Sequence, residues 1–368
     1  MRMVNSDKNN KRKCEEKVSS DSEDEKPTKK TTKRRNISRK TKEPNLNCSD
    51  FNLNSISDLK GLIQFAVFLR DKYKRRKKVG VLRITECIDE LEDLNNVIGL
   101  DDLKNQVTQQ IMFFCLGLND SEMMHTVISG PPGMAKTTVG KKIGLIYSKM
   151  GFLSEGHVIS ATRADLIGQY LGETSIKTQL LLEASIGGVL FIDEAYNLGS
   201  KDGKDSFATE CINTINLFLS ENSKNFMCII AGYEKELKTM FFGANPGLER
   251  RFPWWFKLKP YSIDCLVDIF MYQIEIANWK RDESVDKPFI KNLINFQDKL
   301  FQNNGGDTLT LFDKCKISHS RRVFLEPPEQ RKILTKLDMT EGFKLFKVMK
   351  ISNGANGKMS DSMRAMYC

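Results

Sequence analysis

The sequence predicts an α/β protein in which a parallel five-stranded sheet is flanked by helices and followed by a small all-helical lid domain. Between about residues 91 and 259, short β-branched or apolar runs alternate with helical patterns, as in parallel strands joined by crossover helices. Beyond Pro260 the strand-like runs stop, and helical periodicity continues to about Lys350. Strands are expected at residues 125–130, 157–161, 188–193, 226–232 and 254–258, and the clearest helices at 140–150, 174–184 and 207–221.

The N-terminal quarter has a different composition. Residues 1–50 are rich in Lys, Ser, Asn, Thr and Glu and hold few large apolar residues, so they cannot bury enough surface to fold alone. Apolar residues then recur at helical spacing between residues 57 and 78, which predicts a helix that packs on the body or on a partner. The expected segments are a disordered tail (1–50), a helical extension (51–90), an α/β domain (91–259), the helical lid (260–350) and a flexible C-terminus (351–368).

The segment after the first expected strand has the composition of a phosphate-binding loop. A Gly/Pro turn between a strand and a helix lets backbone N–H groups converge on phosphate oxygens. Lys136 would reach the β and γ phosphates of ATP, and Thr137 would bind Mg²⁺. The residues expected to bind the nucleotide here are Gly130, Pro131, Pro132, Gly133, Met134, Ala135, Lys136, Thr137 and Thr138.

A second segment complements this loop. The apolar run before Asp193 suits a central parallel strand that is buried on both faces. Asp193, at the carboxyl end of that strand, can bind Mg²⁺, and Glu194 can orient and deprotonate the attacking water. Loops of the first kind occur by chance in many unrelated sequences, but the two segments in this order predict nucleotide hydrolysis by residues 91–259.

One position departs from the loop consensus G-x-x-x-x-G-K-[ST], because Ala135 stands where a glycine precedes the lysine. That glycine often has a positive φ, where a Cβ costs roughly 1 kcal/mol. Ala135 is either a tolerated variant or the sign of a weakened nucleotide site, in a slow or partner-dependent enzyme.

Composition narrows the class of protein. With 40% hydrophobic and 28% charged residues and no apolar run near the ~20 residues of a membrane span, we expect a soluble globular protein that does not enter a membrane. No signal peptide is visible, so an intracellular location, cytoplasmic or nuclear, is expected. The nine cysteines form no C-x-x-C pair and are expected to be reduced. The histidines, His125, His157 and His319, form no ligand motif and are expected to be structural.

The net charge of +10 is concentrated near the N-terminus. Residues 1–50 carry +6 and residues 70–78 another +6, which leaves −2 for the rest of the chain. The basic run at residues 29–35 is compatible with nuclear import, with nucleic-acid contact or with a solvated tail. A lipid-surface helix at residues 57–78 is less favoured, because its charges cluster at one end instead of along one face.

The carboxylate segment and two further segments carry a family resemblance. Residues 97–102 (VIGLDD), 188–196 (GVLFIDEAY) and 245–253 (NPGLERRFP) make the chain similar to the AAA-plus ATPases over about residues 91–347. Within them, it resembles the branch of red-type Rubisco activase (CbbX) and stage V sporulation protein K. The resemblance implies that the backbone of Val97, Ile98 and Gly99 contacts adenine.

The resemblance also implies a ring. By register Arg251, with Arg250 as second choice, matches the arginine finger that neutralises charge on a neighbouring subunit's γ-phosphate. Because such an arginine acts between subunits, we expect self-association into a ring, expected to be a hexamer. The alternative for Arg251 is a surface arginine.

Tyr170, Leu171 and Gly172 are similar to the pore loop of this branch. An exposed aromatic residue between glycines can grip a substrate chain regardless of its sequence. The loop at residues 199–205 is a second candidate for the lining of the same channel. Tyr170 could instead be a packed core tyrosine.

Two sensor positions depart from the wider superfamily. Tyr233 takes the place of a polar sensor that is commonly Asn or Thr, a form usual in this branch. Gly306 stands where the lid arginine is expected, and Arg321 and Arg322 follow about four helical turns later, too far to replace it. Together with Ala135, the missing arginine argues against rapid autonomous turnover.

The leading functional prediction is an oligomeric, chaperone-like AAA-plus ATPase that remodels a protein target through a central pore. One alternative is a nucleic-acid-associated ATPase that uses the basic N-terminal region. Another is a degenerate, slow ATPase that acts as a nucleotide-gated scaffold. No segment identifies the target protein.

Overall fold

The computed structural model describes residues 46, 48, 50–118, 123–170, 172–200, 205–295, 300–327 and 331–354. The tail predicted at residues 1–50 and the flexible C-terminus predicted at 351–368 lie almost entirely outside these ranges. Within the described ranges, no helix has both the length and the apolar composition needed to cross a membrane.

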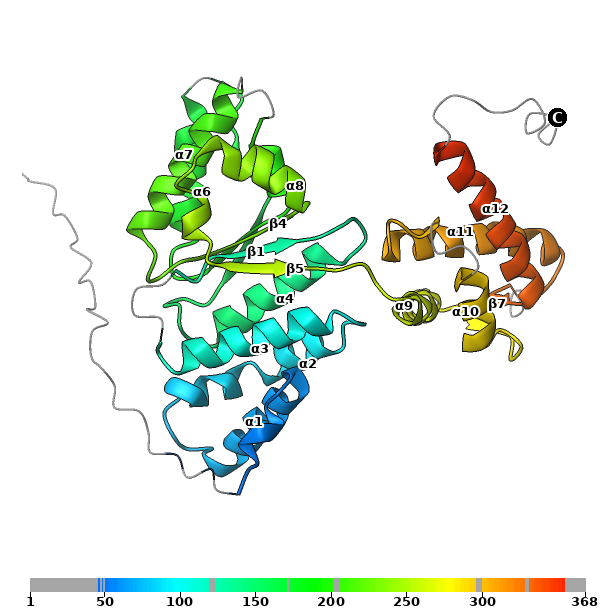
Figure 1. The fold of residues 1–368 in the computed structure, drawn as a ribbon, viewed down its shortest axis with the longest axis horizontal. Helices are drawn as coiled ribbons and strands as arrows, with labels where there is room; N and C mark the ends of the chain where they lie inside the picture. Colours follow the sequence, from blue (N-terminus) through cyan, green and yellow to red (C-terminus); the bar gives the residue numbers. More distant parts are fainter. Residues whose placement is uncertain are drawn as a thin grey trace, which may run out of the picture. The chain divides into compact units, whose positions relative to one another are not determined.

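A parallel five-stranded sheet forms the centre of the α/β body, with strand order β2-β3-β4-β1-β5 (Figure 1). All five predicted strands are confirmed. They are β1 (Thr126–Ser129), β2 (Val158–Ala161), β3 (Val189–Ile192), β4 (Met227–Gly232) and β5 (Trp254–Lys257). Because β1 pairs with β4 and β5 instead of with β2, the chain that leaves Ser129 emerges beside the carboxyl end of β4, where Ser129 pairs with Gly232. Ligands bind at such a crevice in open α/β sheets.

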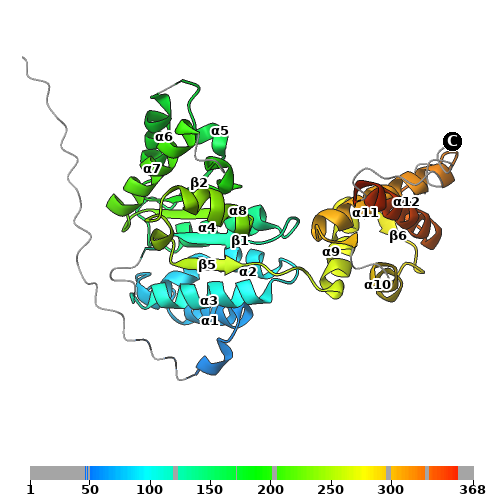
Figure 2. The ribbon, with the colours of Figure 1, turned by 45° about the horizontal axis from the view of Figure 1, so that its top comes forward.

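Helices cover both faces of the sheet (Figures 1 and 2). Successive strand residues point to opposite faces, so Ile128 and Phe191 pack in one core while Val127 and Leu190 pack in the other. The first core includes α3 (Asp101–Cys115) and α4 (Lys136–Lys149), and the second includes α6 (Glu173–Ala184) and α7 (Ser206–Glu221). The shorter segments are α5 (Arg163–Leu166), α8 (Glu234–Glu236), a π-helical turn (Leu237–Phe241) and 3-10 helices at Leu53–Ser55, Gly80–Glu86, Ala195–Leu198, Phe242–Ala244 and Glu249–Arg251.

The N-terminal extension packs on the first layer of helices. Helix α1 (Leu59–Lys72) begins where Asp58 accepts a hydrogen bond from the Gly61 amide at 2.7 Å, and it contacts α2 (Ile88–Asn95) and α3. The helix predicted at residues 57–78 therefore ends earlier, at Lys72 within the basic segment. Its apolar face is buried against the body, which leaves the basic residues 74–77 exposed.

The C-terminal helices form a unit with its own core, which we call the lid. It contains α9 (Ile263–Ile276), α10 (Lys287–Asn295), α11 (Gly305–Arg322) and α12 (Lys336–Gly354). The expectation of an all-helical lid needs one correction. Strand β6 (Lys280–Arg281) pairs in parallel with β7 (Ile333–Leu334). Strands of two residues are too short to produce an alternating pattern, so they could not be predicted from the sequence.

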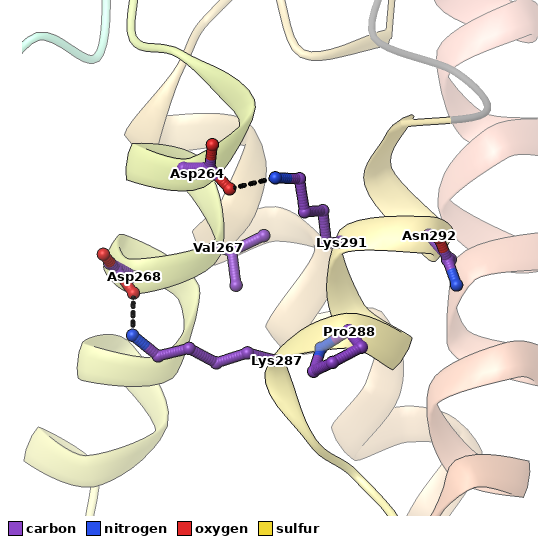
Figure 3. Close-up of a pocket in the computed structure, with 7 residues that line it drawn as sticks. All are labelled: Asp264, Val267, Asp268, Lys287, Pro288, Lys291 and Asn292. Atoms are coloured by element: carbon purple, nitrogen blue, oxygen red, sulfur yellow. Dashed lines mark ion pairs between the residues drawn. The ribbon is translucent and has the colours of Figure 1, made fainter.

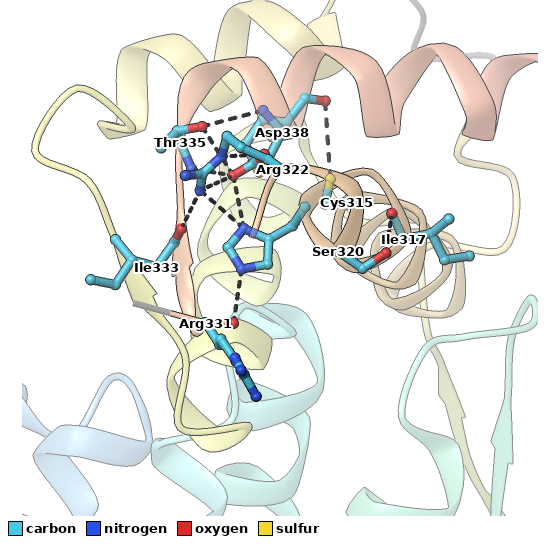
Figure 4. A network of polar contacts seen from close by, with 10 residues as sticks. Cys315, Ile317, Ser320, Arg322, Arg331, Ile333, Thr335 and Asp338 are labelled. Atoms are coloured by element: carbon cyan, nitrogen blue, oxygen red, sulfur yellow. Dashed lines mark hydrogen bonds and ion pairs between the residues drawn. The ribbon is translucent and has the colours of Figure 1, made fainter. Parts of the chain in front are cut away.

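A buried carboxylate fastens the last two helices of the lid together (Figure 4). Asp338 is 2% exposed and accepts hydrogen bonds from Arg322 Nη2 at 2.9 Å and from the Thr335 amide at 3.0 Å. His319 Nδ1 lies 3.0 Å from the same carboxylate, and His319 Nε2 lies 2.8 Å from the Arg331 carbonyl. His319 is thus part of a structural network in the lid.

Candidate functional site

The loop between β1 and α4 has the backbone shape of a phosphate-binding loop. Gly133 has φ 72°, and Ala135, the last residue before α4, has φ 55°. Ala135 therefore adopts the left-handed conformation that the consensus glycine would supply. Because a Cβ in that region costs roughly 1–2 kcal/mol, the loop keeps its shape at the expense of local strain.

Lys136, the first residue of α4, is held inside this loop. Its ammonium donates hydrogen bonds to the carbonyl oxygens of Gly130 at 3.1 Å and Pro131 at 3.0 Å, and it is 6% exposed. It also lies 4.4 Å from the centre of the Tyr233 ring. Burial lowers the pKa of Lys136, and the nearby carboxylate of Glu194 opposes that shift. A buried cation is thus placed where phosphate oxygens would meet it.

Thr137 and Asp193 meet although 56 residues separate them. The Thr137 hydroxyl donates a hydrogen bond of 2.5 Å to Asp193 Oδ2, and Asp193 Oδ1 accepts from the Glu194 amide at 3.0 Å. Mg²⁺ is bound by oxygen ligands, usually one or two from the protein, with waters and phosphates filling the rest. This pair of oxygen donors beside the loop fits that requirement.

A missing side chain lets these two residues approach each other. A Cβ at Gly140 on α4 would lie 2.3 Å from Cε2 of Phe191 on β3, a distance that no real contact tolerates. Gly140 therefore allows α4 to lie directly on β3. The contact is close to the site, because Gly140 follows Thr137 by about one helical turn and Phe191 precedes Asp193 by two residues.

Glu194 is fixed by its backbone and by a tyrosine. It has φ 50° and ψ 42°, and one of its carboxylate oxygens accepts a hydrogen bond from the Tyr196 hydroxyl. Burial raises the pKa of Glu194, while Lys136 opposes that shift. The Tyr196 ring stacks on Tyr233, with centroids 5.3 Å apart and an interplanar angle of 24°. Sequence analysis gave Tyr196 no role, although it closes the segment that carries the family resemblance.

The lid also contacts the phosphate-binding loop, at Gly133. A Cβ at Gly133 would lie 1.8 Å from the carbonyl oxygen of Asn303, and the Gly305 amide donates to the Gly133 carbonyl at 3.1 Å. Gly306, which replaces the expected lid arginine, lies in the first turn of α11 at this contact. Asn304, which sequence analysis missed, is the residue immediately before that helix.

The segment predicted to contact adenine borders a cavity of about 260 Å³. Gly99 lines it, together with Tyr261 and Cys265 from the start of the lid, whereas Val97 and Ile98 do not. Val97 instead accepts a hydrogen bond of 2.6 Å from the buried Lys104 ammonium. Of the three predicted residues, Gly99 is therefore the one placed to border a base.

The predicted arginine finger lies away from the loop of its own chain. Strand β5 begins at Trp254, beside Thr126 at the amino end of β1, whereas the loop follows the carboxyl end. Arg251 comes three residues before that start, where its Nε donates to Ser220 Oγ at 2.7 Å and its Nη1 to the Gly247 carbonyl at 2.5 Å. Arg250 is exposed.

The predicted pore residues are only partly described. Tyr170 is 70% exposed, so the alternative of a packed core tyrosine is wrong. Its amide and that of Gln169 donate to the Glu173 carboxylate at 3.2 and 3.1 Å, and Gly172 has φ 86° just before α6. Leu171 and residues 201–204 of the second predicted loop lie outside the described ranges.

A separate cavity of about 460 Å³ lies in the lid between α9 and α10 (Figure 3). Two ion pairs span it, Lys291 with Asp264 at 2.5 Å and Lys287 with Asp268 at 2.7 Å. Since its charged residues are paired with one another and none belongs to the loop, we do not assign it to the nucleotide.

Comparison with known proteins gives a family for these residues. The sequence model of the ATPase family associated with various cellular activities (AAA) matches residues 126–241, which include the loop and the carboxylate pair. The AAA domain of FIGL-1 in complex with ADP has a similar fold, with a TM-score of 0.53 at 15% identity, over 74% of this chain and 87% of that one.

Curated relatives are similar over longer stretches. The cfxQ-like protein R730 of Acanthamoeba polyphaga mimivirus is 35% identical over 300 residues, which cover 80% of this chain and 74% of that protein. Stage V sporulation protein K of Bacillus subtilis is 29% identical over 68% of this chain and 80% of its own length. Protein CbbX of Cereibacter sphaeroides is 28% identical over 65% and 79%, respectively.

Proposed function

Because this chain belongs to the AAA family of ATPases, in the branch of CbbX and stage V sporulation protein K, we propose that it is a ring-forming motor that remodels a protein target. The family makes it an ATP hydrolase. The observation that carries the proposal is the convergence of Lys136, the Thr137 and Asp193 oxygens, and Glu194 on one loop.

Each of these residues has a distinct role in the proposed hydrolysis. Thr137 and Asp193 would hold Mg²⁺, which supplies charge neutralisation between the phosphates. The Lys136 ammonium leaves the loop carbonyls for phosphate oxygens and stabilises the charge that develops on the transferred group. Glu194 takes a proton from the attacking water through the carboxylate oxygen that Tyr196 does not hold.

The position of Arg251 supports a shared active site. An arginine toward the opposite end of the strands cannot serve the loop of its own chain, but it can face the loop of a neighbouring copy in a ring. We propose a hexamer, with Arg251 as the residue that acts across the subunit boundary.

The exposed Tyr170 supports the part of the proposal that concerns a substrate. A tyrosine that is 70% exposed and lies two residues before a glycine with positive φ can contact a peptide chain in the channel of a ring. Leu171 and Gly172 complete the proposed pore loop.

The test is a substrate trap. Glu194→Gln should bind ATP, fail to hydrolyse it, assemble and retain its target, because the base is lost while the phosphate contacts remain. Lys136→Ala is the control that should neither bind ATP nor retain the target, and Tyr170→Ala should hydrolyse ATP but release the target. Equal ATPase rates in the wild type and Glu194→Gln would contradict the proposal.

A second candidate function is a nucleic-acid-associated ATPase, which the exposed basic residues after α1 favour. Lys74, Arg75 and Lys77 are exposed and lie within four residues of one another, a density of charge that suits a phosphate backbone. Binding to DNA or RNA should then weaken steeply with salt and fall in a variant with these residues changed to Ser. An ATPase rate that no nucleic acid changes would leave this candidate without support.

A third candidate, a slow ATPase that acts as a nucleotide-gated scaffold, depends on Ala135 and Gly306. Turnover measured at several protein concentrations separates it from a ring motor. A ring should gain activity per subunit as it assembles, whereas a scaffold should stay slow at every concentration.

A further inference from the structure

The residue before α11 has an unusual backbone in a buried place. Asn304 has φ 48° and ψ −120° and is 2% exposed. A non-glycine residue is kept in such a conformation only where its surroundings fix it, and such residues are concentrated at functional sites. Asn304 lies where the lid meets the phosphate-binding loop.

The side chain of Asn304 joins three parts of the chain. Its Nδ2 donates to the carbonyl of Pro132 in the loop at 3.2 Å and to that of Gln302 in the lid at 3.3 Å. Its Oδ1 accepts from the amide of Tyr261, in the linker between β5 and α9, at 3.0 Å. Because carbonyls only accept and a backbone amide only donates, these partners fix which way the side-chain amide points.

Backbone contacts reinforce the same junction. The Gly305 amide donates to the Gly133 carbonyl at 3.1 Å, and no side chain at position 133 would fit beneath Asn303. From there, Asp307 accepts from the Asn303 amide at 2.7 Å and pairs with Lys350 of α12 at 2.5 Å. A displacement of the loop would therefore be passed to both α11 and α12.

We propose that Asn304 is the positioning residue that couples the phosphate-binding loop to the lid, in place of the lid arginine that is expected at position 306. An arginine at that position would link the lid to the nucleotide, whereas Asn304 links the lid to the loop that binds the nucleotide. This inference rests on the proposed function as a nucleotide-driven motor. It makes the bond from Asn304 to the Pro132 carbonyl a link through which phosphate binding moves the lid, beside the backbone bond from Gly305 to Gly133.

Two variants of the full-length chain test the coupling. Asn304→Asp keeps the acceptor for Tyr261 but places an oxygen against the Pro132 and Gln302 carbonyls. Asn304→Gly relieves the positive φ and removes all three side-chain bonds. Gln273→Met is the control, because Gln273 donates to the Gly305 carbonyl at 2.9 Å from within the lid and does not touch the loop.

The readouts are ATP turnover and amide hydrogen exchange of the first turn of α11, with and without ADP. In the wild type and Gln273→Met, ADP should slow that exchange, and the two kcat values should agree within twofold. Both Asn304 variants should bind ADP without slowing the exchange, and their kcat should fall about tenfold while KM changes less.

Wild-type kcat and a normal ADP effect on exchange in both Asn304 variants would overturn the coupling. So would equal losses in all three variants, since these would indicate a loss of lid stability alone. A wild-type protein that does not hydrolyse ATP would instead contradict the proposed function.

Discussion

Tyr196 donates a hydrogen bond to the carboxylate of Glu194, and its ring stacks on Tyr233, 5.3 Å away. The ammonium of Lys136 in turn lies over the Tyr233 ring, 4.4 Å from its centroid. Two stacked rings thus connect the proposed base with the proposed phosphate-binding cation. Gly232 leaves room for them, because a Cβ there would lie 2.8 Å from Cδ1 of Tyr196.

We predict that Tyr196→Phe lowers kcat about tenfold and leaves KM within twofold, because the ring stays in place while Glu194 loses the bond that orients it. A donated hydrogen bond favours the ionised carboxylate, so its removal should raise the pKa of Glu194 further. The acidic limb of the kcat profile should then move to higher pH. A pH profile identical to the wild type would contradict this role.

Ala135→Gly should stabilise the protein without changing nucleotide affinity. The substitution removes roughly 1–2 kcal/mol of left-handed strain, while the greater backbone entropy of the unfolded chain costs about 0.5–1 kcal/mol, for a net gain of up to about 1.5 kcal/mol. Urea unfolding and ADP titration measure the two effects. Ala208→Gly, at a buried position of helix α7, should lose roughly 1–2 kcal/mol in the same assay, because it removes both a helix-favouring residue and a buried methyl group. Tighter ADP binding by Ala135→Gly would support the hypothesis that Ala135 weakens the nucleotide site.

Gly306→Arg should increase the preference for ATP over ADP about tenfold, as expected for a charge-assisted bond to a γ-phosphate oxygen. The backbone position accepts a side chain, because a Cβ at Gly306 would lie no closer than 3.9 Å to Cβ of Asn303. Gly306→Ala is the matched control and should improve helix propensity alone. If the two variants show the same ATP and ADP affinities, an arginine at this position does not reach the nucleotide.

The lid should lose stability in acid through Asp338. Burial alone would raise the pKa of Asp338, but hydrogen bonds from Arg322, His319 and Thr335 outweigh it and hold the pKa well below its usual range. The stabilisation is therefore present above the unfolded pKa of roughly 3.9 and is lost as the pH falls from there toward the folded value.

Asp338→Asn should cost roughly 1.5–3 kcal/mol at neutral pH, because it removes charge-assisted hydrogen bonds from the partly buried Arg322 and from Thr335, and should flatten the dependence below pH ~4. Hydrogen exchange of α11 and α12 measures both effects. The exposed Asp313, paired with Lys316, provides the control Asp313→Asn, which should change stability by less than about 1 kcal/mol. An unchanged acid profile in Asp338→Asn would contradict the assignment.

The sheet was predictable because each long strand is an apolar or β-branched run bounded by polar or turn residues. The same logic failed for β6 and β7, which have two residues each. It also placed the end of α1 too late. The helical pattern continues into the basic run, but Tyr73 has φ −123° and ψ 35°, outside the helical region, so the helix stops at Lys72.

The candidate site was predictable where a motif has fixed spacing. Thr137 and Asp193 could be paired in advance because each follows a strand whose neighbours are set by the fold. Asn304 could not, because its partner Pro132 is 172 residues away and nothing local marks the contact. Tyr196 lay within a recognised segment, yet its role depends on a ring contact with Tyr233 that no spacing rule predicts.

Gly140 has a consequence for how this protein tolerates mutation. Only glycine fits between α4 and β3 at this position, since even the methyl group of an alanine would overlap the Phe191 ring. Any larger residue would lift the helix away from the strand and separate the Thr137 hydroxyl from the Asp193 carboxylate. A change at a position that touches neither nucleotide nor metal would therefore disable hydrolysis as surely as a change in the loop itself.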